Sequence, residues 1–587
     1  MKKQTKLVAV LSTASLLAIG ASMTSFAATG WVEEDGTWVY YNRDGERATN
    51  EWKKSGNSWY YLDDNGEMAI DQLIEDDDNY YYVDINGVMA TNQWVALENE
   101  DAGENDEPDQ NWYYFQANGK ALTNGNNDNV SLKTINGKKY AFDDEGKMLW
   151  GWVAADNAEH IDNSDGDAFM DGDYYFGDAD DGAMTVGWLQ MDITYEEATN
   201  EEYKEIAPVF NDDEDQTRWF YFKSNGKKVY AEDGDVQKSR TINGKKYEFD
   251  QYGAMTAEWS LDVESASKNK VASGNSTPTT NSVAAKYAQQ WRYFSDVENG
   301  ARVSKGWFKV VSAEYLNYDR YNDDEEAWYY ADGSGDLYAG QFKTIKGKKY
   351  AFRDDGRMID GLKFIKEANG GLDVIPNDHN GYPFDTEDDF VNNAPYWHAK
   401  GYSCYYFGDG EDGAMKTGKT TIEIDGDKFT FEFGTSGSKK GKGETGEDDD
   451  KMYQSGMLLK AGSDEKYQVV KKLDKNIDKN EDGKGLEGYK KLDDVDAFLA
   501  EFGMTTDNKT NPSSVNLSAL GISKKADDID ELYVIPTKDD DNKTTKDTYV
   551  LINTSGKTVT KDSRNKDGND YYYVVDGGRI TAIYTED

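Results

Sequence analysis

The stretch WVYYNRDG at residues 38–45 recurs as WYYLDDNG at residues 59–66 and as YYYVDING at residues 80–87. The closing glycines of the three copies lie 21 residues apart, and a large apolar residue stands seven positions before each copy, at Trp31, Trp52 and Leu73. Aromatic residues favour strands, and a glycine after Asp or Asn supplies the positive φ of a tight turn. Each copy is therefore predicted to be one β-hairpin.

A single hairpin of this size is only marginally stable in water. Short units that recur at a fixed period become stable by stacking on their neighbours. Aromatic residues make up 13% of the chain, whereas all hydrophobic residues together reach only 37%. The sequence therefore predicts an all-β, elongated solenoid of stacked aromatic β-hairpins, in which rings rather than aliphatic side chains provide most of the burial.

Related hairpins recur along the chain. TINGKKY at residues 134–140 returns at 241–247 and as TIKGKKY at 344–350, and YYFGDADDGAM at 174–184 returns as YYFGDGEDGAM at 405–415. We predict one repeat array over residues 28–264 and a second over residues 283–418. The Ser-, Thr- and Asn-rich segment 265–282 between them is either a linker at a domain boundary or a long loop within one continuous array.

Residues 419–587 form a degenerate C-terminal region of unknown role, because the repeat pattern weakens there. Apolar residues at helical spacing predict one short amphipathic helix that ends at Gly503; they are Leu486, Tyr489, Leu492, Val495, Leu499 and Phe502. The lysine-rich stretch 439–451 is predicted to be low-complexity and mobile. YYYV at 571–574, followed by Asp576-Gly577, predicts a last hairpin.

The chain is strongly acidic, with 112 acidic residues against 65 basic ones and a formal net charge of −47. Such a charge disfavours nucleic acid and anionic membranes as partners. Residues 1–27 are predicted to be a secretory signal peptide, with lysines at 2, 3 and 6, an apolar run over 7–20 and a small-x-small cleavage site at 25–27. This apolar run is too short to span a bilayer, so we expect a secreted protein without membrane insertion.

Two minor features predict little chemistry. The single cysteine, Cys404, excludes an intrachain disulfide framework, and we interpret it as a small buried filler. The stretch DKNEDG at residues 478–483 resembles the start of an EF-hand loop, but Tyr489 stands where a bidentate Glu is needed. An acidic surface turn is the better interpretation, and no metal or cofactor is expected.

Aromatic boxes between stacked hairpins are the main candidate site. The spacing predicts that Trp31 and Trp38 of one hairpin meet Tyr61 of the next, and that Trp52 and Trp59 meet Tyr82. Such a box can hold a quaternary ammonium by cation–π attraction, or it can stack on the face of a sugar. The alternative for any single ring is that it only fills the space between hairpins.

These residues resemble a known family. The Gly-Trp starts at 30–31, 151–152, 187–188 and 306–307, with the Trp-Tyr-Tyr hairpins, are similar to the cell-wall-binding (choline-binding) repeats of Gram-positive surface proteins. The TINGKKY copies also resemble the carbohydrate-binding repeats of clostridial toxins and glucan-binding glucosyltransferases. The resemblance implies cages of two Trp and one Tyr, with a Met nearby; it extends the ligand-binding set to Met68, Met89, Trp94 and Trp112.

The sequence departs from this family pattern at several places. Leu73 replaces a head Trp, and lysines stand where the strand Trp is expected in the TINGKKY hairpins, at Lys139, Lys246 and Lys349. From the resemblance we expect those hairpins to lack a full cage.

No catalytic motif accompanies the boxes. The chain holds only three histidines, and it contains neither an HExxH helix nor a GxSxG elbow. We therefore expect a non-catalytic protein, secreted and associated with the cell wall, that binds teichoic acid or another choline-bearing or glycan polymer. One alternative is an adhesin that binds host or dietary glycans. The other is an envelope glycan hydrolase whose carboxylate pair lies in residues 419–587.

Overall fold

The structure is a computed structural model that describes residues 29–193, 216–232, 237–261, 281–314, 316–368, 370–375, 385–561 and 563–587. The predicted signal peptide lies outside these residues, as does the segment 265–282 except for its last two positions. The chain forms two compact units: residues 1–269 with 294–302, and residues 270–293 with 303–587. Within the described residues, no helix is long and apolar enough to cross a membrane.

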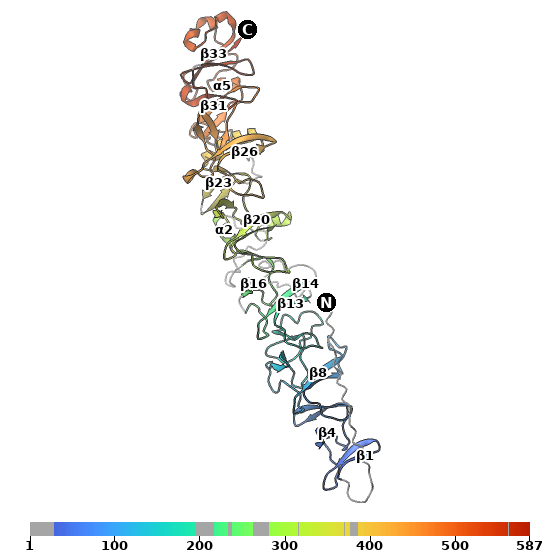
Figure 1. Ribbon diagram of the computed structural model, residues 1–587. Coiled ribbons are helices and arrows are strands. Elements are labelled where there is room, and N and C mark those ends of the chain that lie inside the picture. The colour runs from blue at the N-terminus through green and yellow to red at the C-terminus, as the bar shows by residue number, and fades with distance from the viewer. Residues whose placement is uncertain are drawn as a thin grey trace. The chain divides into compact units, whose positions relative to one another are not determined.

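The first compact unit consists of antiparallel two-stranded hairpins that follow one another in chain order, from β1 to β16 in Figure 1. This confirms the predicted hairpins. The strands are β1 (Gly30–Glu34), β2 (Thr37–Tyr41), β3 (Glu51–Ser55), β4 (Ser58–Leu62), β5 (Gln72–Asp76), β6 (Asn79–Val83), β7 (Gln93–Glu98), β8 (Gln110–Phe115), β9 (Lys133–Ile135), β10 (Lys138–Tyr140), β11 (Trp152–Val153), β12 (Tyr174–Tyr175), β13 (Gly187–Ile193), β14 (Gln216–Phe222), β15 (Lys238–Ile242), β16 (Lys245–Phe249) and β17 (Glu258–Leu261).

A tight turn follows the second strand of each hairpin. After β4, the Asp63 carboxylate accepts hydrogen bonds from the backbone N–H groups of Asn65 and Glu67, and Gly66 adopts a φ of 74°. Asp84 and Gly87 repeat this arrangement after β6. The Asp and the Gly of each turn therefore have separate tasks: the side chain binds the turn amides, and the glycine supplies the positive φ.

One backbone hydrogen bond connects each hairpin to the preceding one. The N–H of Met68, which follows β4, donates to the carbonyl of Trp38 in β2 at 2.8 Å, and Met89 donates to Trp59 at 2.9 Å. The Met side chain then packs on the turn glycine of the next hairpin. A Cβ at Gly87 would lie 2.9 Å from the sulfur of Met68, and Gly87 adopts a φ of 74°, so a larger residue would displace the Met side chain and strain the turn. Successive hairpins therefore stack through one backbone hydrogen bond and one contact between a Met side chain and a turn glycine.

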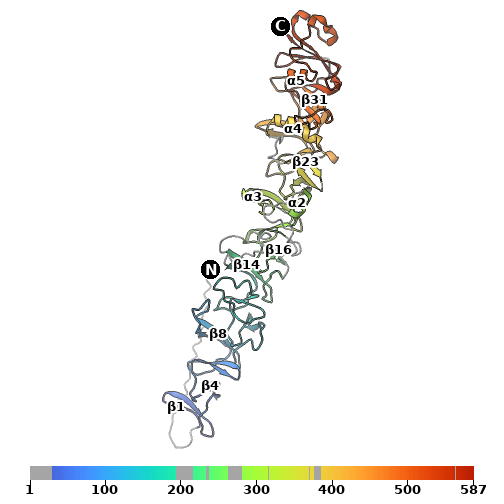
Figure 2. The same ribbon diagram turned by 180° about the vertical axis from the view of Figure 1, so that it is seen from behind.

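The second compact unit begins with similar hairpins and continues with broader sheets of three, five, three and four strands (Figure 2). Its strands are β19 (Gly306–Val311), β20 (Glu326–Ala331), β21 (Gln341–Ile345), β22 (Lys348–Phe352), β23 (Leu362–Ala368), β24 (Gly371–Val374), β25 (Ser403–Tyr406), β26 (Gly418–Ile424), β27 (Asp427–Phe433), β28 (Gly446–Asp448), β29 (Lys451–Gln454), β30 (Met457–Leu458), β31 (Tyr467–Leu473), β32 (Gly488–Lys491), β33 (Ile529–Val534), β34 (Tyr549–Asn553), β35 (Ser563–Lys566), β36 (Tyr572–Asp576) and β37 (Arg579–Glu586); β18 is Trp291–Phe294.

The helices are short and few among the described residues. They are α2 (Asn281–Ala288), α3 (Tyr318–Asn322), α4 (Glu387–Ala399), α5 (Val495–Ala500) and α6 (Thr545–Thr548). The last two positions of the predicted linker thus open α2. The side chains of Phe390 in α4 and Phe431 in β27 are fully buried and pack at 5.4 Å, so this helix belongs to the core of the broader sheets.

Two predictions for residues 419–587 are corrected. The amphipathic helix is α5 alone and spans residues 495–500; residues 488–491 form strand β32 instead, since Gly488 adopts a φ of 113° and β32 pairs with β31. Residues 446–448 form β28 within the five-stranded sheet, so the prediction of a mobile segment at 439–451 is wrong. The last hairpin is confirmed as β36 and β37.

Of the two minor features, Cys404 is buried, and the stretch 478–483 is a surface turn whose first residue is buried. Cys404 is 1% exposed, and burial raises the pKa of its thiol, which confirms the interpretation as a core filler. The stretch 479–483 is mostly exposed and forms a turn, which confirms the interpretation as an acidic surface turn, but Asp478 itself is only 7% exposed. Its carboxylate pairs with Lys471 at 2.8 Å and with Lys543 at 2.5 Å, so two ammonium groups occupy the oxygens that a cation would need.

Candidate aromatic ligand-binding boxes

Five hairpins of the described residues carry, on each of their two strands, a Trp that is not buried, whereas Trp259 in β17 and Trp291 in β18 are buried. The pairs are Trp31 and Trp38, Trp52 and Trp59, Trp94 and Trp112, Trp188 and Trp219, and Trp307 and Trp328. In the first hairpin Trp31 stands opposite Tyr40. Side chains two positions apart share one face of a strand, so Trp38 and Tyr40 lie on the same face as Trp31.

The ring that closes each box comes from the following hairpin. Trp31 packs against Tyr40 at 5.4 Å and against Tyr60 at 5.2 Å, with interplanar angles of 79° and 70°. Trp52 packs in the same way against Tyr61 at 5.1 Å and Tyr81 at 5.0 Å. Each box is therefore walled by rings that meet at steep angles.

The predicted closing residues Tyr61 and Tyr82 are wrong by one position. Neighbouring residues of a strand point to opposite faces, so Tyr60 closes the box of Trp31, whereas Tyr61 packs on Trp52 of its own hairpin. Tyr82 is 9% exposed, stacks on Phe115 at 6.1 Å and donates a hydrogen bond to Asp71. The predicted pairs of Trp do share hairpins as expected.

The TINGKKY hairpins close three further boxes. Trp94 packs against Tyr140 at 4.9 Å, Trp188 against Tyr247 at 4.9 Å, and Trp307 against Tyr350 at 4.8 Å. These hairpins lack a strand Trp, but they complete the box of the hairpin before them. The sequence signal was available, because each TINGKKY copy follows a hairpin with two Trp.

The methionines lie at the same junctions. Met148, Met255 and Met358 pack in the clusters that contain the rings of these three boxes. Met68 and Met89 hold the corresponding positions in the first two boxes, through their bonds to the carbonyls of Trp38 and Trp59. In each of these five boxes, a Met therefore lies at the junction between the hairpin of the box and the following hairpins.

The box tryptophans are half-buried, and Trp59 is 40% exposed. By contrast, Trp152 is 2% exposed and Trp291 is fully buried. The partly exposed rings can reach a ligand, whereas Trp152 and Trp291 act as core residues.

A carboxylate lies at the rim of the three later boxes. The indole N–H of Trp112 donates to Asp180 at 3.4 Å, that of Trp219 to Glu298 at 3.4 Å, and that of Trp328 to Glu411 at 3.2 Å. Each acid belongs to a turn that lies 68, 79 or 83 residues further along the chain. Sequence reasoning missed these residues, since only stacking brings the turns to the boxes.

The charge at these rims differs from box to box. Lys309 forms an ion pair with Glu411 at 2.8 Å, and its hydrogen bond lowers the pKa of that carboxyl group. At the corresponding place the amide of Gln190 donates to Glu298 at 3.2 Å. The rim of the Trp188 box thus holds a carboxylate that a neutral group contacts, while the rim of the Trp307 box already holds a cation.

The hairpin of Trp152 shows a cation inside such a ring arrangement. The ammonium of Lys228 lies 5.1 Å from the centroid of the Trp152 ring and also donates to the carbonyl of Phe169. Lys228 holds the position of the junction Met, because its N–H donates to the carbonyl of Asp173. Here the protein's own side chain supplies the positive charge.

The geometry favours a compact cation as ligand. Rings at steep angles enclose a rounded group from several sides, whereas a sugar stacks its flat face on a single ring. A cation over aromatic faces gains about 0.5–2 kcal/mol per contact, and a rim carboxylate adds a favourable charge. A quaternary ammonium carries a positive charge on an apolar shell, so it suits both features.

The repeats match known sequence families. The choline-binding repeat family matches residues 28–72 and 49–94, and the putative cell wall binding repeat family matches residues 106–121. The comparison with curated protein sequences gave no match.

Several solved structures from Streptococcus pneumoniae are similar to the chain at low identity. The modular autolysin LytC is 18% identical over 57% of this chain and 54% of its own, with a TM-score of 0.28, so the chain spans about half the length of that autolysin. The choline-binding domain of CbpL is 21% identical over 39% of this chain and 88% of its own, with a TM-score of 0.23. Choline binding protein F is 16% identical over 74% of this chain and all of its own, with a TM-score of 0.20.

Proposed function

Because the chain carries choline-binding repeats of the cell-wall-binding class, we propose that it is a secreted, non-catalytic protein that attaches to the cell envelope. Its ligands are the choline groups of teichoic acid or of another choline-bearing polymer. The observation that carries this proposal is the rim carboxylate at the boxes of Trp94, Trp188 and Trp307. A carboxylate beside three rings favours a cationic ligand over a neutral one.

The number of boxes fits attachment to a polymer. Each box binds one small cation weakly, but a polymer that presents many such groups can occupy several boxes of one chain at once. Linked sites raise the overall affinity by about 10²–10⁴ without any new contact. The net charge of −47 also attracts cationic groups and repels bare anionic polymers.

The first experiment is a titration of the full chain with choline, followed by tryptophan fluorescence. The matched probe is 3,3-dimethylbutan-1-ol, which has the same shape as choline without its charge. We expect saturable choline binding and at least tenfold weaker binding of the alcohol. Equal binding of the two probes would overturn the cation assignment and favour a panel of glycans.

A second experiment tests attachment. The variant with Trp94→Ala, Trp188→Ala and Trp307→Ala is expected to lose most of its binding to purified walls that contain choline. Tyr321→Ala is the control, since Tyr321 is 49% exposed and lies outside the boxes. Equal binding to walls without choline would contradict the proposed ligand, and release of soluble wall fragments would contradict the non-catalytic assignment.

A further inference from the structure

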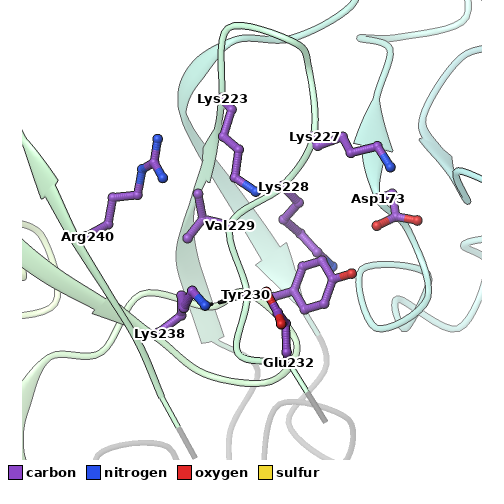
Figure 3. A pocket seen from close by; sticks show the side chains of 9 residues that line it. All are labelled: Asp173, Lys223, Lys227, Lys228, Val229, Tyr230, Glu232, Lys238 and Arg240. Atoms are coloured by element: carbon purple, nitrogen blue, oxygen red, sulfur yellow. Dashed lines mark hydrogen bonds and ion pairs between the residues drawn. The ribbon is translucent and has the colours of Figure 1, made fainter. Parts of the chain in front are cut away.

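A basic cavity lies beside the last strand of the Trp188 hairpin. It has a volume of about 170 Å³, and five of its lining residues are cations: Lys223, Lys227, Lys228, Lys238 and Arg240. Figure 3 shows Lys238 and Arg240 approaching from one side, while Lys227 and Asp173 lie on the other. One water needs only about 10–15 Å³ of such space, so the cavity has room for a small polyatomic group.

The charge of this cavity is opposite to that of the protein. Its two lining carboxylates, Asp173 and Glu232, are outnumbered by the five cations, and Lys238 pairs with Glu232 at 3.4 Å. The pKa of Lys223 is lowered, first by burial and then by the charges of Arg240, Lys227 and Lys238. Positive groups are thus held close together, and an anion between them would offset their mutual repulsion.

The repeat itself shows that these lysines replace its usual residues. Lys223 opens the turn at 223–227, a position where Asp63, Asp84 and Asp143 each bind turn amides with their carboxylates. Lys223 cannot accept such hydrogen bonds. Lys228 replaces the junction Met, and its buried ammonium loses hydration, which lowers its pKa to about 8. Both substitutions therefore add positive charge to the lining of this cavity, with the ammonium of Lys228 donating to the carbonyl of Phe169.

We propose that this cavity binds a phosphate group. A tetrahedral oxyanion accepts hydrogen bonds in several directions at once, and lysines together with an arginine supply donors from both sides. The site is separate from the aromatic boxes and binds the opposite charge. The phosphate can be free inorganic phosphate or a phosphate carried on a polymer, since both present the same oxygens.

The test is calorimetric titration of the full chain with inorganic phosphate and with a glycerol phosphate oligomer. We expect saturable binding of one ion per chain, weakened about tenfold or more by Lys223→Asp and by Arg240→Ala. Lys223→Asp restores the usual turn residue, so this variant is expected to fold at least as well as the original. Lys245→Ala, an exposed residue of the same β15–β16 hairpin that does not line the cavity, is the matched control.

The outcomes separate the two sources. If inorganic phosphate and the oligomer bind with comparable affinity, free phosphate is sufficient as the ligand. If only the oligomer binds, the ligand is a phosphate carried on a polymer. No saturable binding of either probe, or binding that Lys223→Asp leaves unchanged, would overturn the proposal. Phosphate binding is tested independently of choline binding, because the aromatic boxes remain intact in all three variants.

Discussion

The hairpins of Trp152 and Trp188 follow one another along the chain, yet their tryptophans have opposite roles. Trp152 is 2% exposed, packs on Phe220 at 5.4 Å and carries the ammonium of Lys228 over its ring. Trp188 is half-buried, packs on Tyr247 at 4.9 Å, and its box has Glu298 at the rim. The same hairpin scaffold thus holds two kinds of box. In the filled box, at Trp152, the protein's own ammonium covers the ring; in the open box, at Trp188, the rings remain accessible to an external ligand.

The hairpin stack and the binding site are therefore separable. The stack needs the junction hydrogen bond, which both Lys228 and Met255 make through their backbone N–H. The binding site depends instead on which side chain stands at the junction position and on the rim acid that a later turn supplies. A Met and a rim acid leave the rings free for an external cation, whereas a Lys supplies an internal one.

Truncation of the filled box is expected to cause the largest effect. Trp152→Ala removes a buried ring of the core cluster that contains Phe169 and Phe220. We expect a loss of about 3–5 kcal/mol in the free energy of unfolding, measured by urea denaturation, with an unchanged number of choline sites under native conditions. A loss below about 1 kcal/mol would mean that Trp152 is not a core residue.

Truncation of the open box is expected to remove binding instead. Trp188→Ala deletes the ring that contacts both Tyr221 and Tyr247. The choline affinity of this box is expected to fall by about 2–3 kcal/mol, so calorimetry on the full chain should detect one site fewer. If the number of sites does not change, the ring assignment fails.

Replacement of Lys228, the internal cation, is expected to change how the free energy of unfolding depends on pH. The pKa of Lys228 is lowered to about 8 by burial, so its charged form costs stability below pH 8, and this cost disappears as pH rises toward the unfolded pKa. Lys228→Met is therefore expected to raise the free energy of unfolding by about 2 kcal/mol at pH 7. The gain should shrink by pH 10. A gain that is independent of pH would point to packing rather than charge.

The rim carboxylate is expected to have the smallest effect. Glu298→Gln keeps the shape and an acceptor for Trp219 but removes the charge, so choline binding at this box should weaken about fivefold, or roughly 1 kcal/mol. The loss should shrink at high salt because the rim is exposed. As a matched comparison, Glu411→Gln should have less effect, since Lys309 already neutralises that carboxylate at 2.8 Å.

The sequence predicted the repeated hairpins well, for a local reason. Aromatic strands and Asp/Asn-Gly turns act within a few residues, so hairpins such as β1–β2 and β36–β37 could be read directly. Residues 486–492 misled the prediction because apolar spacing alone does not register Gly488, whose positive φ ends a helix. In the broader sheets, packing against strands that are distant in the sequence decided the structure.

The hairpins, the tryptophan pairs and the expectation of a choline-type box all followed from local sequence patterns. Which tyrosine closes each box depends on how the hairpins stack, because a shift of one residue on a strand reverses the face and selects Tyr60 over Tyr61. Stacking also decides the charge of each site. Asp180, Glu298, Glu411 and Lys228 reach rings far from them in sequence, and only the stacking of one hairpin on the next brings those charges and rings together.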